Sequence, residues 1–146
     1  MSGEYLDPYA EGLVSSDFYA QKKPVDSRLV VVLRGEVAKR GLTLITTPTR
    51  AVRAGDIHEL LISDEFGIKP GSVVNRISYV GFVEILTGGV IAVGDAVCAE
   101  GKVIGLLAGF DYTHMPNHMN IVLSANPMLS GEMLRLNLDD AISFTC

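Results

Sequence analysis

Short runs of β-branched and other apolar residues, each ended by Gly, Pro or Asp, recur from residue 28 onward and constrain the fold more than any other feature. Runs of this length bounded by turn residues are typical of strands. No segment of ten to twelve residues shows a clear helical period. We therefore predict an all-β fold, a small antiparallel β-barrel or sandwich. A barrel would also leave no exposed sheet edge.

Turn residues suggest how these strands connect. Residues 28–37 and 42–47 read as two strands of one hairpin, with a turn at 38–41 that ends in glycine. A second hairpin is expected over residues 95–109, with its turn at Glu100–Lys102. Gly81 is expected to bulge or bend the long run at 72–86, because glycine in a strand often marks such a bend.

The remaining predicted strands lie toward the C-terminus. They are expected at residues 119–125, 133–138 and 139–144.

The first 27 residues differ in character from the rest. They carry aromatic residues, prolines and acids without a clear period, the aromatic residues being Tyr5, Tyr9, Phe18 and Tyr19. A free tail would be poorer in aromatic residues. We predict an irregular N-terminal arm over residues 1–27 that precedes a barrel domain at 28–146. Such an arm would pack on the body of the domain or on a neighbouring subunit, and we favour a homo-oligomer in which the arm crosses to a partner.

Charge and composition exclude several classes of protein. The 146 residues are 48% hydrophobic and carry a net charge of −5, which fits one globular domain. The basic residues are scattered, so no nucleic-acid-binding surface is expected. No signal peptide and no apolar run long enough for a transmembrane helix is found, so we predict a cytoplasmic protein without membrane contact.

Only two cysteines occur, Cys98 in an apolar run and Cys146 as the last residue. Two cysteines in a chain of this length do not make a disulfide framework, although a single disulfide stays open. Cys98 is interpreted as a small buried hydrophobic residue.

The segment FDYTHMPNHMNIVL, residues 110–123, contains the densest group of polar residues. His114 and His118 lie four residues apart, and Asp111 precedes them. Pro116 between the histidines argues against a helix, so we expect a loop between two strands. Two imidazoles and one carboxylate are ligands that suit a divalent transition metal, so Asp111, His114 and His118 form the candidate metal site.

The same loop has two other interpretations. Asp111, Asn117 and Asn120 could line a metal-free pocket for a small ligand. Equally, aspartate and asparagine side chains commonly accept or donate hydrogen bonds within turns, which would make all these residues structural.

Three further residues could join the loop if the fold brought them close. Glu84 or Glu100 could supply a base or a fourth ligand, and His58 could supply a third imidazole. In its apolar strand context, His58 is better interpreted as a solvent-facing or hydrogen-bonded residue.

Residues 84–95 (EILTGGVIAVGD), 102–105 (KVIG) and 117–123 (NHMNIVL) resemble, in this order, the glucitol/sorbitol-specific IIA proteins of the bacterial sugar phosphotransferase system. The resemblance covers about residues 77–144 and implies a small cytosolic β-barrel. That family carries phosphate on a histidine whose matching position falls near Val80, and no histidine occurs within fifteen residues of Val80. The resemblance therefore implies the barrel and argues against the family's phosphotransfer.

Taken together, the sequence predicts a small-molecule-binding or metal-dependent cytosolic β-barrel protein with its site on the loop from Asp111 to Asn120. The first alternative is a non-enzymatic accessory or interaction domain with structural histidines. The second is a divergent phosphotransferase component phosphorylated on His114 or His118. No motif identifies a substrate, a reaction or a particular metal.

Overall fold

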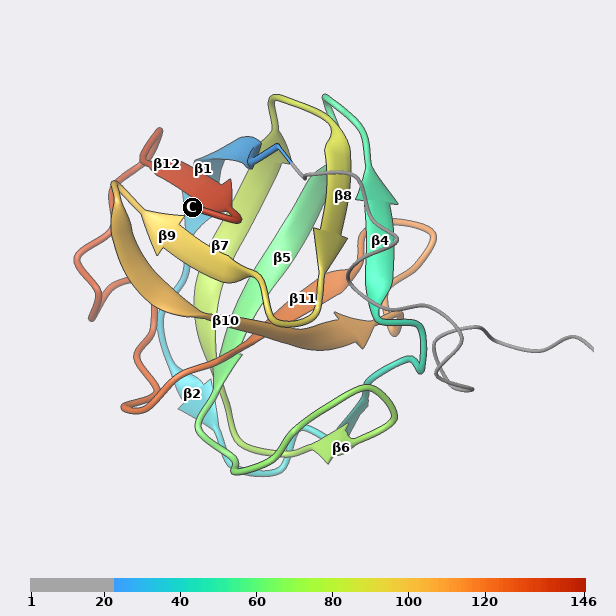
Figure 1. The fold of residues 1–146 in the computed structure, drawn as a ribbon. Helices are drawn as coiled ribbons and strands as arrows, with labels where there is room; N and C mark the ends of the chain where they lie inside the picture. The colour runs from blue at the N-terminus through green and yellow to red at the C-terminus, as the bar shows by residue number, and fades with distance from the viewer. Residues whose placement is uncertain (1–22) are drawn as a thin grey trace, which may run out of the picture.

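The computed structural model describes residues 23–146, and over this range the fold is all-β, with strands and turns and no helix (Figure 1). The prediction of an all-β fold is confirmed. The strands are β1 (Val25–Val32), β2 (Glu36–Val37), β3 (Leu42–Thr43), β4 (Thr49–Val52), β5 (Ile57–Ser63), β6 (Val73–Val74), β7 (Ile77–Ile85), β8 (Gly89–Ala92), β9 (Ala96–Ala99), β10 (Lys102–Asp111), β11 (Asn120–Ser124) and β12 (Ala141–Phe144).

The main sheet closes on itself. Its strands follow the order β1-β12-β9-β10-β11-β5-β7, and β1 also pairs with β7, so seven strands form a hydrogen-bonded ring. The short strand β2 pairs in antiparallel orientation with the beginning of β7. All pairings in the ring are antiparallel except β11 with β5, which is parallel.

Each strand of the ring sends apolar side chains to one shared core. Phe110 and Phe144 are its largest fully buried members. Because alternate residues of a strand point to opposite faces, the residues of β5 divide between two clusters. Leu60 and Ile62 belong to the main core, whereas Leu61 belongs to a second cluster on the outer face.

Two small ribbons complete the described fold. Strands β3 and β6 pair with each other and supply Leu42 and Val74 to the outer cluster, so they cover part of the outer face of β5 and β11. Strands β4 and β8 form the second ribbon and send Val52 and Ile91 to the main core (Figure 1).

The predicted hairpin of residues 28–37 and 42–47 is wrong. β1 pairs with β7 and β12, while residues 42–43 pair with β6. The chain turns away after β1 at Gly35, whose φ of 95° is a conformation that glycine adopts without steric cost. β1 also begins at Val25, inside the segment assigned to the arm. The rest of that arm, up to residue 22, lies outside the described residues.

The predicted hairpin at residues 95–109 is confirmed. β9 and β10 are antiparallel, and Glu100 and Gly101 form the turn with φ values of 49° and 82°. Gly81 does lie beside a bulge, because the register of β5 against β7 passes from Gly81 directly to Tyr79. The long run at 72–86 nevertheless divides between β6 and β7, before Gly81 is reached.

The strand predicted at residues 133–138 is also wrong, since this segment has turns and irregular backbone and no strand. Leu134 and Leu136 pack against the main core, which explains their alternation without a strand partner. Arg135 between them has a φ of 58°, which is outside the β region.

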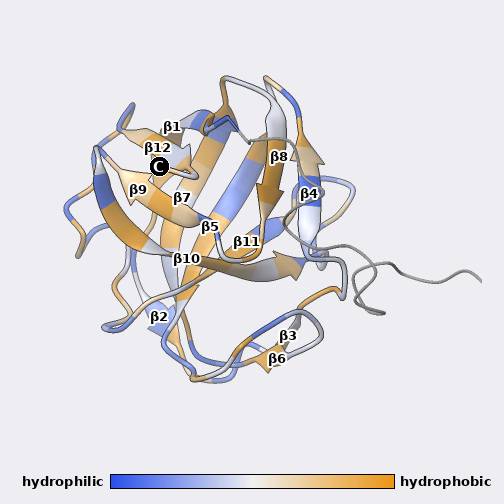
Figure 2. Ribbon diagram, viewed as in Figure 1, coloured by the Kyte–Doolittle hydropathy of each residue, from blue (hydrophilic) through white to orange (hydrophobic). Residues whose placement is uncertain are grey.

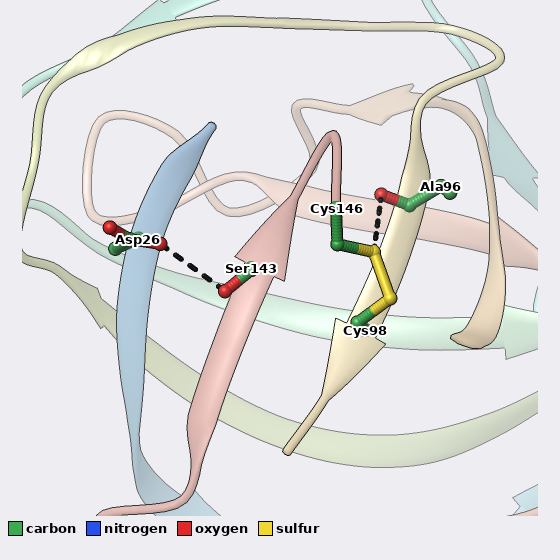
Figure 3. The surroundings of a disulfide bond; sticks show 5 residues. All are labelled: Asp26, Ala96, Cys98, Ser143 and Cys146. Carbon is green, nitrogen blue, oxygen red and sulfur yellow. Dashed lines mark hydrogen bonds between the residues drawn. A yellow bond between two sulfur atoms is a disulfide. The ribbon is translucent and has the colours of Figure 1, made fainter. Parts of the chain in front are cut away.

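Cys98 and Cys146 form a disulfide between β9 and the residues that follow β12 (Figure 3). Cys98 is buried, as interpreted from the sequence, but its sulfur is cross-linked. Beside it, Ser143 Oγ donates a hydrogen bond to Asp26 at 3.2 Å, so β1, β12 and β9 are linked by side chains as well as by their ladders.

No helix in the described part of the chain is long and apolar enough to cross a membrane.

Replacing Gly81 should destabilise the ring where β1 meets β7. A Cβ atom at Gly81 would overlap the carbonyl oxygen of Val31 and lie 2.9 Å from Leu29 Cδ1. We expect Gly81→Ala to lower the free energy of unfolding by about 3 kcal/mol, measured by urea denaturation. The control is Gly88→Ala, whose Cβ would lie 3.1 Å from Val52 O and should cost about 1 kcal/mol or less. Equal costs would contradict the assigned packing.

The disulfide should contribute to stability because it closes a chain segment with a sequence separation of 48. A loop of this length predicts a loss of up to about 4 kcal/mol when the cross-link is removed. We expect Cys146→Ser to lower the urea midpoint, and a reductant to lower the wild-type midpoint to that of the variant. A reductant that shifts the variant as much as the wild type would refute this contribution.

Candidate functional site

A row of polar side chains crosses three neighbouring strands on the outer face of the ring. Asp111 of β10 faces Asn120 of β11, and Asn120 faces Glu59 of β5 in the parallel pair. All three residues are buried, with exposed fractions of 2%, 1% and 8%. In Figure 2 part of β5 is coloured hydrophilic, whereas β7 beside it is mostly hydrophobic. A buried carboxylate in such a strand needs polar or cationic partners.

The turn at residues 112–119 supplies these partners. The Asp111 carboxylate holds its start, because Thr113 N and Asn120 Nδ2 donate to Oδ1 at 2.9 and 3.1 Å. Further along, Asn117 N donates to His114 O at 2.9 Å, which folds the turn back over the sheet. Both predicted histidines of the loop are thereby placed on the outer side, near Glu59.

Glu59, His114 and His118 each offer a ligand atom, and these atoms lie within 4.8 Å of one another. His118 Nε2 is 3.4 Å from Glu59 Oε1. Two ligands of a tetrahedral metal with bonds of 2.0–2.1 Å are separated by roughly 3.3 Å. The pair therefore already has the spacing of metal ligands. His114 is exposed on the turn, and its ring centroid lies 5.0 Å from that of His118.

The His118 ring lies in a defined orientation. Its centroid is 5.1 Å from that of Phe82, at an interplanar angle of 78°. Its Nδ1 is 3.1 Å from Asn117 Nδ2. The side-chain amide of Asn117 can present either its NH₂ or, after a half-turn, its oxygen, so it can hold the Nδ1–H tautomer that leaves Nε2 available to a metal.

His118 Nε2 is buried and has no hydrogen-bond partner of good geometry among the described residues. Its 3.4 Å approach to Glu59 Oε1 is an ion-pair distance only, and the ring must be protonated for it to carry charge. A buried ring nitrogen without a hydrogen bond thus lies beside a buried carboxylate, and a bound cation could coordinate both.

The guanidinium of Arg40 would compete with a metal ion for His114. Its Nη2 lies 3.3 Å from His114 Nε2. Because a guanidinium only donates, this contact uses the lone pair that His114 would give to a metal. Metal binding through that nitrogen therefore requires Arg40 to move away.

Burial raises the pKa of the Glu59 carboxyl, and the neighbouring His118, His114 and Arg40 partly offset that effect. The carboxyl therefore ionises less readily than an ordinary glutamate. A bound divalent cation would restore the carboxylate form, because ligand deprotonation and metal binding are linked.

His58 is not part of this group. It precedes Glu59 on β5, so its side chain points to the opposite, inner face. Met119 N donates to its Nδ1 at 3.1 Å, which ties β5 to the start of β11. Burial is the main cause that lowers the pKa of His58, and the ring is therefore neutral near pH 7. The interpretation of a hydrogen-bonded histidine fits this placement.

The other sequence-derived candidates lie apart from the three ligand atoms. Asp111 accepts hydrogen bonds within the turn and is separated from Glu59 by Asn120. Glu84 pairs with Arg28 at 2.7 Å, and Glu100 accepts a hydrogen bond from Ala141 N at 2.7 Å.

The position near Val80, which the resemblance to the IIA proteins assigns to a phosphorylated histidine, is fully buried in the main core. Phosphorylation on His114 or His118 stays a prediction.

Glu59 was missed by the reasoning from sequence. A signal was present, because Glu59 is a charged residue within the apolar strand DIHELLI. A charged residue at a buried strand position is a candidate for function. The parallel pairing that brings it to the histidines joins segments about sixty residues apart, and no local pattern indicates that pairing.

Comparison with known proteins identifies a family for this chain but assigns no activity to it. No curated protein and no solved structure matches the chain. One family model does match, over residues 19–145, and that range includes every strand of the ring and all three candidate ligands. On this evidence the chain belongs to a family of unknown function, DUF6917.

Proposed function

We propose that this protein binds a divalent transition-metal ion through Glu59, His114 and His118. The observation that supports this most is the His118–Glu59 pair, a buried ring nitrogen without a good hydrogen-bond partner at 3.4 Å from a buried carboxylate oxygen. Two imidazoles and one carboxylate suit zinc, and also iron, nickel or copper.

The position of the ligands indicates what such a metal could do. Three protein ligands leave at least one coordination position for water or a small ligand, as in catalytic zinc sites. His114 is exposed, so that position would be open to solvent. A metal held in this way would polarise a bound ligand or lower the pKa of bound water, which is the physical basis of metal-assisted hydrolysis.

The proposal can be tested by metal content. Tag-free protein, stripped with chelator and reloaded with one equivalent of Zn²⁺, should retain near-stoichiometric metal by elemental analysis after desalting. Loading with Co²⁺ should give the visible absorption of a tetrahedral or five-coordinate site. Glu59→Gln and the double variant His114→Ala/His118→Ala should lose most of the metal, because each removes a ligand.

Asp111→Asn is the matched control, because an asparagine oxygen can still accept the hydrogen bonds from Thr113 N and Asn120 Nδ2. It should keep its metal. Loss in Asp111→Asn with retention in Glu59→Gln would favour the ligand set expected from sequence instead. No metal in the wild type, with equal melting temperatures for all variants, would favour the accessory domain with structural histidines.

Arg40 provides a test in the opposite direction. Removing its charge should tighten Zn²⁺ binding on the order of tenfold at low salt, because a cation beside His114 both repels the metal and occupies a ligand atom. Titration calorimetry of Arg40→Gln would measure this gain. Lys39→Gln removes the same charge from the adjacent exposed residue and should change affinity far less. Weaker binding in Arg40→Gln would refute the role of Arg40 as a competitor.

A further inference from the structure

A surface cavity of about 390 Å³ lies where β4, the start of β5 and the 112–119 turn meet. Its volume is within the range of small-molecule sites. Its walls include Arg50, Arg53, Asp56, His58, Met115 and Pro116.

None of the three candidate metal ligands lines this cavity, although Asn117, which contacts His118, does. His58 lines the cavity, whereas Glu59, the next residue of β5, supplies a candidate metal ligand. Consecutive strand residues point to opposite faces, and the side-chain clusters agree, with Leu60 in the main core and Leu61 in the outer cluster. The turn lies between the two sites, since Pro116 faces the cavity while His118 faces Glu59.

His58 presents a fixed hydrogen-bond donor at this cavity. Because its Nδ1 accepts from Met119 N, the ring proton of the neutral imidazole is on Nε2. His58 is only 6% exposed, and its Nε2 is buried without a hydrogen-bond partner among the described residues. The nearest acidic oxygen, Asp56 Oδ2, is 3.8 Å away, which is beyond hydrogen-bond distance.

Arg50 supplies a second unpaired donor. Its Nε is also buried without a partner in the described part of the chain, while its Nη1 donates to Ala51 O at 3.2 Å. The guanidinium lies 5.7 Å from the centroid of the Tyr112 ring, which helps to hold it in place. Arg50 and His58 both line the cavity, and each has a buried N–H group for which the described residues provide no acceptor.

The charge of the walls indicates what kind of acceptor fits. Arg50, Arg53 and the carboxylate of Asp56 line the cavity, so its arginine charges exceed its carboxylate charge by one. Asp56 is already engaged, because Arg53 N donates to its Oδ2 at 2.9 Å and Arg53 Nε lies 3.7 Å from its Oδ1. Apolar side chains of Met115, Pro116 and Ile57 form the rest of the wall.

We propose that this cavity binds a small organic monocarboxylate, whose oxygens accept hydrogen bonds from Arg50 Nε and His58 Nε2 and whose short apolar part lies against Met115 and Pro116. A single negative charge balances the walls. A carboxylate offers two oxygens for the two donors, and an inorganic anion would leave the apolar wall unused.

The direct test is titration of the metal-free 146-residue protein with butyrate, monitored by ¹H–¹⁵N NMR. We expect saturable shifts concentrated in the backbone amides of Ala51, Ile57 and Asn117, which line the cavity. Butyramide, which has the same size without the charge, and inorganic phosphate should each bind at least about tenfold more weakly. Absence of saturable shifts, or equal binding of butyramide or phosphate, would overturn the proposal without any variant.

Variants then test whether Arg50 contacts the bound butyrate. Arg50→Gln should weaken butyrate binding about tenfold or more, because it removes the buried Nε donor together with the charge. Arg76→Gln, an exposed arginine paired with Asp64 at 2.9 Å, is the control and should bind as the wild type does. Wild-type affinity in a folded Arg50→Gln variant would refute the assignment.

The proposal does not depend on a metal. Glu59→Gln should bind butyrate with wild-type affinity, because Glu59 lies on the other face of β5. Failure of the metal proposal and failure of this one are therefore separate results. Butyrate binding that requires Zn²⁺ would overturn the assignment to this cavity.

Discussion

The pairing of β1 with β7 closes the main sheet into a ring around the core, and β5, which carries residues of both candidate sites, is a strand of this ring. A closed ring gives every strand an inner face and an outer face. On β5 this division separates two neighbouring polar residues, so that His58 faces the cavity and Glu59 faces the histidines of the turn. The close approach at Gly81, where no side chain separates β7 from the carbonyl of Val31, lets the two strands meet. The positions of the polar groups thus follow from how an apolar core is enclosed.

Much of the secondary structure could be predicted from local pattern, and less of the pairing. β-Branched runs and a tight turn at Glu100–Gly101 correctly indicated an all-β fold and the β9–β10 hairpin. The pairing of β1 could not be read in this way, because its partners are distant in sequence. The segment at residues 133–138 shows the complementary error, since Leu134 and Leu136 pack on the core although the segment contains no strand. Alternation of apolar residues can reflect packing on the core without a strand, because a strand also needs a partner.

At the candidate site too, local sequence patterns identified nearby residues but not a partner that is distant in sequence. His114 and His118 were found because they are close together in sequence, and the structure places both beside Glu59. Asp111 was chosen for the same reason, yet Asn120 of the intervening strand separates it from Glu59. Its carboxylate instead holds the turn that carries the histidines. Proximity in sequence could identify the turn, whereas the third ligand comes from a parallel pairing that only the folded chain reveals.

The place of β12 has a consequence for how the ring is assembled. This strand lies between β1 and β9, so among residues 23–146 the last strand in sequence joins the first strand to β9 (Figure 1). Until it docks, the facing edges of β1 and β9 have unpaired backbone groups of the kind that promote association between chains. Such long-range pairing is slow to form. The disulfide from Cys146 to Cys98 cross-links the residues that follow β12 to β9, its neighbour in the ring, so it opposes separation of β12 from this edge.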